Sequence, residues 1–141
     1  MGLSGKEEEF FLKYLYVDHV FQIIERVDYY LIYNIEKCSE QSDIPDGAYL
    51  SDLPERMKLP IERISEAMRG MEEKGYVTWE LHDSKERTYV KLTNRALEQA
   101  DRQRQKIVDA YNEITENIPR HELEITVATL GKIRELMADE A

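Results

Sequence analysis

Cysteine, glycine and proline are scarce in this chain of 141 residues, which contains one, six and four of them. The single cysteine, Cys38, excludes an internal disulfide and is typical of a reducing cytoplasm. No apolar run is long enough to span a membrane and no secretory signal is recognisable, so we expect a cytoplasmic protein without membrane contacts. Long stretches without glycine or proline predict a mainly helical fold.

Residue patterns that carry catalysis or bind metals are also missing. There is no Gly-rich phosphate loop and no Ser/His/Asp arrangement, so we predict no enzyme activity and no cofactor. His19, His82 and His121 are scattered and lack a cysteine partner, which argues against a metal site. Cys38 has only Lys37 as a basic neighbour and no second cysteine to resolve an oxidised thiol, which argues against a peroxide sensor.

Positive charge is scarce, with 19 Lys and Arg against 29 Asp and Glu and a net charge of −10. The imbalance is uneven: there are 4 basic against 10 acidic residues in 1–49, 9 against 9 in 50–95, and 6 against 10 in 96–141. The acidic excess therefore lies in the two flanks. Because proteins bind DNA largely through its phosphates, a neutral middle segment argues against tight non-specific DNA binding.

The N-terminal flank is predicted to be helical. Residues 6–38 contain neither glycine nor proline, and their apolar positions follow a 3–4 spacing as far as Ile24. The pattern resumes in a shifted phase at Val27. Asp28 at this shift predicts a kink, or two helices of which the second is capped by Asp28. Residues 39–47 are predicted to be a polar loop with a turn at 45–47.

Residues 50–95 begin with two predicted helices and a tight turn. Ser51 or Asp52 is expected to cap the first helix, and Pro60 separates the two because it starts a helix well but cannot continue one. In the second helix the apolar residues recur at spacings of 3, 4 and 3, which predicts one buried stripe, and Gly75 ends the helix with a left-handed cap. The stripe consists of Ile61, Ile64, Met68 and Met71.

A two-stranded hairpin is predicted to follow. Residues 76–79 and 88–90 are rich in β-branched and aromatic side chains, and the polar residues 83–86 between them are expected to form a turn. A helix-turn-helix followed by a hairpin is a winged helix, a structure that usually reads DNA. The predicted fold class is therefore mainly α with a small β-hairpin wing.

Two amphipathic helices are predicted after the hairpin, at 94–118 and 121–138, separated by Pro119. The first keeps a 3–4 seam over three heptads, on which only Arg104 is polar; such a seam requires a partner helix, either in the same chain or in a second subunit. A winged helix does not need so much flanking helix to fold, so we expect 1–49 and 96–141 to be the dimerisation region of a single domain, 1–141. The expected interface residues are Phe10, Val17, Phe21, Ile107, Tyr111, Ile114, Leu130 and Ile133.

A set of residues in the two helices and the hairpin matches a known family in identity and spacing. These residues are Leu53, Met57, Ile64, Met71, Glu72, Lys74, Gly75, Val77, Asp83, Arg87, Leu92 and Thr93. With the order of the elements, they resemble the MarR family of winged-helix transcription regulators, with PadR-type regulators as an alternative because the wing is short. Ala96 stands where the family normally has glycine. Glu62 and Glu66 stand where it more often has hydroxyl or basic residues.

The resemblance implies that the second helix of the winged helix enters the major groove. The wing is expected to reach phosphates or a minor groove, with a solvated turn as the alternative. A plain solvated helix face is the alternative, since glutamates outnumber arginines there. Asp83 is expected to pair with Arg87 and brace the hairpin. The residues expected to contact DNA are Glu62, Arg63, Ser65, Glu66 and Arg69 in the helix and Lys85, Arg87 and Lys91 in the wing.

Tyrosines gather in the N-terminal flank. Tyr14, Tyr29, Tyr30 and Tyr33 could line a pocket for a small aromatic effector, or simply pack within a dimer interface. Together these features predict a ligand-responsive homodimeric repressor that binds palindromic double-stranded operator DNA. The alternative from another class is a winged-helix protein–protein interaction module that has lost DNA binding.

Overall fold

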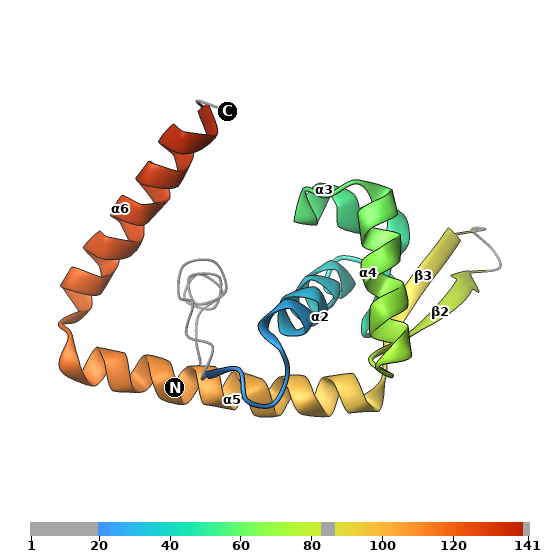
Figure 1. The fold of residues 1–141 in the computed structure, drawn as a ribbon, viewed down its shortest axis with the longest axis horizontal. Coiled ribbons are helices and arrows are strands. Elements are labelled where there is room, and N and C mark those ends of the chain that lie inside the picture. The colour runs from blue at the N-terminus through green and yellow to red at the C-terminus, as the bar shows by residue number, and fades with distance from the viewer. Residues whose placement is uncertain (1–19, 83–86, 140–141) are drawn as a thin grey trace. The chain divides into compact units, whose positions relative to one another are not determined.

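The computed structural model describes residues 20–82 and 87–139 (Figure 1). Residues Phe21–Arg104 form one compact unit, and the rest of the described chain belongs to a second. The fold is mainly helical with one small sheet, as predicted. Its elements are α2 (Arg26–Ser39), β1 (Gly47–Tyr49), the 3-10 helix η2 (Leu50–Asp52), α3 (Leu53–Met57), α4 (Ile61–Glu73), β2 (Val77–His82), β3 (Arg87–Leu92), α5 (Asn94–Asn117) and α6 (Arg120–Asp139).

The sheet has three antiparallel strands in the order β1-β3-β2. β2 and β3 form the predicted hairpin, in which Val77 pairs with Leu92 and His82 with Arg87. β1 adds a third strand that was not predicted: Gly47 was expected to end a loop, and residues 48–49 were not assigned. Its three residues are all buried and pair with residues 89–91, about forty positions later, so local sequence carries little sign of it.

Gly47 fits β1 because it has no side chain. A Cβ atom there would lie 2.6 Å from Ile44 Cγ2 and 2.7 Å from the backbone oxygen of Val90, and a backbone atom cannot move aside cheaply. We expect Gly47→Ala to lower the free energy of unfolding by about 1–3 kcal/mol, measured in urea. Gly70→Ala is the matched control, because a Cβ on Gly70 meets nothing within 4 Å and should stabilise α4 slightly. Equal stability of Gly47→Ala and the wild type would contradict the crowding.

The core of the first unit lies between α2, α4 and the sheet. Tyr29, Ile32 and Ile35 of α2 are fully buried, and so are Ile64 and Met68 of α4. Periodicity therefore identified the buried face of α4 correctly at three of four positions, since Met71 is buried as well. The exception is Ile61, which is 40% exposed because it opens the helix beyond the edge of the core.

Local residues fix both ends of α4. Pro60 precedes the helix in an extended conformation, and its carbonyl accepts hydrogen bonds from the backbone N–H groups of Arg63 and Ile64. At the other end Gly75 has φ +80°, and Tyr76 N–H donates to the carbonyl of Met71. This is the left-handed glycine cap expected from the sequence.

The two side-chain caps proposed from the sequence are absent. α2 begins at Arg26 after Glu25, with no side-chain cap, and Asp28 lies inside its first turn. Asp52 precedes α3 but makes no side-chain cap bond. Both carboxylates bind cations from distant parts of the chain instead, and these partners were not apparent from short-range spacing.

The buried side chain of Gln103 connects α5 to the segment before α2. Its Oε1 atom accepts hydrogen bonds from the backbone N–H groups of Ile23 at 3.0 Å and Ile24 at 3.2 Å. The chain is therefore held against α5 just before α2. The predicted first helix was expected to reach Ile24, but residues 21–25 are not helical; its earlier part, up to residue 19, lies outside the described residues. In α6, by contrast, none of the side chains described over 120–137 is buried.

Candidate nucleic-acid interface

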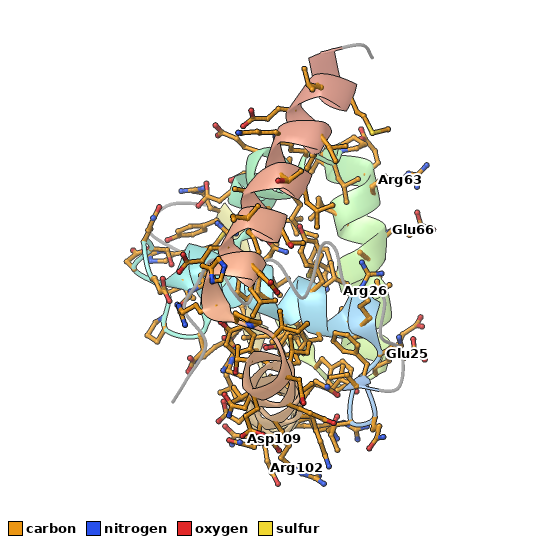
Figure 2. All side chains as sticks on the ribbon, turned by 90° about the vertical axis from the view of Figure 1, so that its left-hand side faces the viewer. Glu25, Arg26, Arg63, Glu66, Arg102 and Asp109 are labelled. Atoms are coloured by element: carbon orange, nitrogen blue, oxygen red, sulfur yellow. The ribbon has the colours of Figure 1, made fainter. Side chains whose placement is uncertain are left out.

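The face of α4 that points away from the core is polar and open. Glu62, Arg63, Glu66 and Arg69 are exposed and Ser65 is half-buried. Figure 2 shows Arg63 and Glu66 projecting outward from the helix. The structure thus brings the five helix residues expected from the sequence onto one accessible surface, which we call the α4 face.

The charge of the α4 face is mixed. Within the described chain neither Arg63 nor Arg69 has an ion-pair partner, so both guanidinium groups are available to a ligand. Glu62 and Glu66 lie beside them and repel anions. Lys74, just after the helix, is already engaged: its Nζ lies 2.7 Å from Oδ2 of the buried Asp28, and this hydrogen bond raises the pKa of Lys74.

Arg87 attaches the start of β3 to the helix-turn-helix. Its Nη2 atom donates to Ser51 Oγ at 2.7 Å and lies 3.1 Å from Asp52 Oδ1. The guanidinium carbon is 3.8 Å from the centre of the Tyr49 ring, which adds a cation–π contact. The expected partner Asp83 lies outside the described residues, as does Lys85, whereas Lys91 is exposed on β3. We call the contacts of Arg87 with Tyr49, Ser51 and Asp52 the Arg87 brace.

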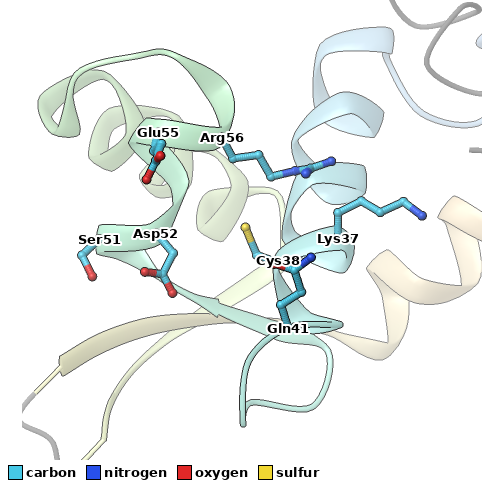
Figure 3. A pocket seen from close by; sticks show the side chains of 7 residues that line it. All are labelled: Lys37, Cys38, Gln41, Ser51, Asp52, Glu55 and Arg56. Atoms are coloured by element: carbon cyan, nitrogen blue, oxygen red, sulfur yellow. The ribbon is translucent and has the colours of Figure 1, made fainter. Parts of the chain in front are cut away.

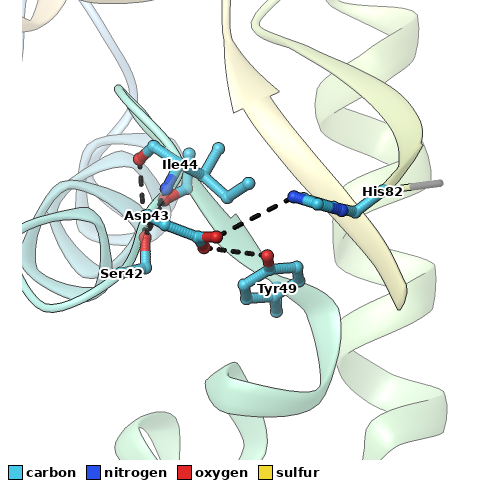
Figure 4. Close-up of polar contacts among 6 residues, drawn as sticks. Ser42, Asp43, Ile44, Tyr49 and His82 are labelled. Atoms are coloured by element: carbon cyan, nitrogen blue, oxygen red, sulfur yellow. Dashed lines mark hydrogen bonds and ion pairs between the residues drawn. The ribbon is translucent and has the colours of Figure 1, made fainter. Parts of the chain in front are cut away.

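A second set of polar contacts holds the end of β2 (Figure 4). Tyr49 donates its hydroxyl proton to Asp43 Oδ1 at 2.8 Å, and His82 Nε2 lies 3.8 Å from Asp43 Oδ2. The rings of Tyr49, His82 and Tyr89 have centroids 6.1–6.5 Å apart. Sequence reasoning missed this cluster because Asp43 and His82 are 39 positions apart and no local pattern links them.

The tyrosines expected to line an effector pocket differ in burial. Tyr29 and Tyr33 are buried in the core, Tyr30 is half-buried, and Tyr14 lies outside the described residues. Phe21 packs against Tyr29 with ring centroids 6.0 Å apart. Tyr29 and Tyr33 are therefore part of the core of the single chain, and both the effector pocket and the dimer-interface packing stay predictions.

A polar hollow of about 590 Å³ lies elsewhere, between the end of α2 and the start of α3 (Figure 3). Arg56 on its wall donates to Asn34 Oδ1 at 2.9 Å, so its guanidinium is partly engaged within the fold. Burial raises the pKa of the Cys38 thiol, which keeps it protonated and weakly nucleophilic. The hollow is lined by Lys37, Cys38, Gln41, Ser51, Asp52, Glu55 and Arg56.

The residues expected at a dimer interface differ in exposure. Ile107 is completely buried within the single chain, whereas Ile133 on α6 is 47% exposed. Phe21, Tyr111, Ile114 and Leu130 are half-buried, and Phe10 and Val17 lie outside the described residues. Further apolar side chains are exposed along α6, namely Ile125, Leu136 and Met137.

The described residues contain neither a group of potential metal ligands nor a helix that could cross a membrane. No three histidine, cysteine or acidic side chains in that part of the chain gather closely enough to hold a metal ion. Each helix in it is too short or too polar to span a bilayer.

A helix-turn-helix followed by a strand pair, with a third strand in front, defines a winged helix. No family model matches the sequence. No curated protein matches it either. Solved structures do match: AbsC, a MarR family transcriptional regulator from Streptomyces coelicolor, has a TM-score of 0.64 at 16% identity and covers 99% of both chains.

Two further matches were solved with DNA. A mutant MarR from E. coli complexed with operator DNA has a TM-score of 0.64 at 15% identity and covers 82% of this chain and 84% of its own. The S. aureus MepR–DNA complex has a TM-score of 0.62 at 13% identity and covers 81% and 78%. The chain therefore has the winged-helix fold of the MarR-family transcriptional regulators.

Proposed function

We propose that this protein is a sequence-specific DNA-binding transcriptional regulator of the MarR type. The observation that carries the proposal is the α4 face, whose polar side chains are open while the opposite side of the helix is buried in the core. This is the arrangement that a helix-turn-helix needs to enter a major groove. The proteins of the same fold that were solved with DNA support it.

Each residue of the α4 face has a specific role in this proposal. Arg63 and Arg69 contact phosphates or guanine, and Glu62 and Glu66 accept hydrogen bonds from cytosine N4 while repelling non-specific DNA. Ser65 adds a hydroxyl to the same surface. In the wing, Lys85 and Lys91 contact the backbone, and Arg87 contributes mainly by holding the wing in place through the Arg87 brace.

The active form is proposed to be a homodimer. Each large apolar side chain described over 123–137 on α6 remains at least partly accessible, and Ile125, Leu136 and Met137 are strongly exposed. A second copy of the chain would remove this surface from water. Two copies would present two α4 helices to the two halves of a palindromic operator. We further propose repression and control by a small effector, for which the polar hollow is a better candidate site than the tyrosines.

The proposal is tested by selecting DNA from a random pool with the wild-type protein. We expect enrichment of a palindrome whose half-sites lie about 10 base pairs apart, one helical turn. Sequencing of the bound fraction and footprinting of the enriched site provide the measurement. A bound fraction without any shared sequence would refute sequence-specific binding.

The second candidate is a protein-interaction module. It is favoured by the glutamates of the α4 face and by the lack of a basic excess in residues 50–95. In that case the selection recovers no DNA, and the α4 face is the docking surface for a partner with complementary positive charge.

A further inference from the structure

Two large apolar side chains stay exposed at the turn that leads into α4. Leu59 and Ile61 are each 40% exposed, on either side of the exposed Pro60. Three residues further on, Ile64 is completely buried. The exposure of Ile61 therefore reflects its position at the first residue of α4, where the helix extends past the core.

The backbone holds this pair in place. Lys58 adopts a left-handed conformation with φ +56°, which reverses the chain, and Leu59 N–H donates to the carbonyl of Pro54 at 3.2 Å. Pro60 has a fixed φ and starts α4. Leu59 and Ile61 are thus presented from a short, constrained turn, so little conformational entropy is lost when they are covered.

We propose that Ile61, supported by Leu59, contacts the 5-methyl group of a thymine in the major groove and so selects thymine at that position. The proposal rests on the proposed function. In a helix-turn-helix the N-terminal residues of the second helix reach the base edges, and Ile61 is the first residue of that helix. Neither side chain has a donor for a phosphate. The thymine methyl is the apolar group that the major-groove edge of a base pair displays.

The mixed charge of the α4 face makes such a contact important for sequence specificity. Glu62 and Glu66 contribute no attraction to the DNA backbone, and Arg63 and Arg69 can bind phosphate at any sequence. An apolar contact at Ile61 discriminates between bases without adding to non-specific affinity. It therefore adds specificity where the surrounding charge supplies little general attraction.

The test uses the site recovered by the random-pool selection, resynthesised with deoxyuridine in place of each thymine in turn. This exchange removes the methyl group and keeps the base pair and its groove acceptors. We expect the wild type to lose about threefold to fivefold in affinity at one symmetric position in each half-site. Ile61→Ala should bind the thymine site more weakly and should no longer distinguish it from the deoxyuridine site.

Leu81→Ala is the matched control, because Leu81 is also an exposed apolar residue but lies on β2. It should keep the wild-type response to deoxyuridine, and thermal unfolding should show that both variants are folded. Ile61→Val, which keeps an apolar group at the position, should retain most of the methyl response.

Three outcomes overturn the inference. If no deoxyuridine weakens the wild type, thymine methyls are not read, although sequence-specific binding and the proposed function stand. If Ile61→Ala responds to deoxyuridine as strongly as the wild type, another side chain reads the methyl. If the selection recovers no DNA at all, the proposed function fails and this inference fails with it.

Discussion

Ile133→Glu should convert the protein from a dimer to a monomer and lower its affinity for a palindromic site by about 100-fold or more. Ile133 is 47% exposed on α6, and a charge buried there in an interface would have no partner. The loss in affinity follows because two linked half-site contacts become one. Light scattering should give the chain mass of 16.7 kDa for the variant and twice that mass for the wild type.

The matched control is Ala128→Glu, which adds the same charge to the same helix. Ala128 is exposed and lies about 140° around α6 from Ile133, at 3.6 residues per turn. It should remain dimeric. Ile107 is a poor probe, since it is completely buried in the single chain and a charge there would damage the fold. A monomeric wild type at micromolar concentration would rule out the two-half-site mechanism.

The second large effect is expected on the α4 face, where two substitutions should act in opposite directions. Arg63→Ala should weaken binding to a specific site by roughly 1–3 kcal/mol, the usual value of one good base contact. Glu66→Gln should tighten binding to random DNA, because it removes a negative charge that faces phosphates. Both variants and the wild type are titrated with specific and random DNA at two salt concentrations.

Arg102→Ala is the control for the loss of a positive charge, because Arg102 is exposed on α5 (Figure 2). It should leave the affinity for the specific site nearly unchanged. If neither Arg63→Ala nor Glu66→Gln changes affinity for any DNA, α4 does not enter the groove. The α4 face would then be better explained as a docking surface for a protein.

The parts of the fold that sequence predicted best are those decided by neighbouring residues. Pro60 and Gly75 bound α4 because their backbone preferences act locally. β1 could not be predicted in the same way, because its three residues gain their hydrogen bonds from β3, far along the chain. Periodicity also predicted which face of α4 is buried, but it does not show where the core ends. Ile61 was therefore predicted to be buried with the rest of the stripe.

The candidate site was also predicted only in part from the sequence. The α4 face followed from spacing alone, since residues opposite a buried stripe are exposed on any surface helix. The partners of charged side chains did not follow from spacing. Asp52 was expected to cap a helix and instead binds Arg87, and Asp28 instead binds Lys74. The cation that each carboxylate binds is the one that tertiary structure places beside it, and local sequence does not specify that position.

The wing is held at the turn end of the hairpin, where β2 ends and β3 begins, by the Arg87 brace on β3 and by Asp43 at His82 on β2. In mechanical terms, these contacts join the turn end of the hairpin to the rest of the winged helix, so the wing and the helix-turn-helix form a single stiff body. An effector then has little to bend inside this body. In the proposed dimer an effector would instead change the distance between two such bodies. The distance between the two copies of Arg69 is therefore the coordinate that an effector would change.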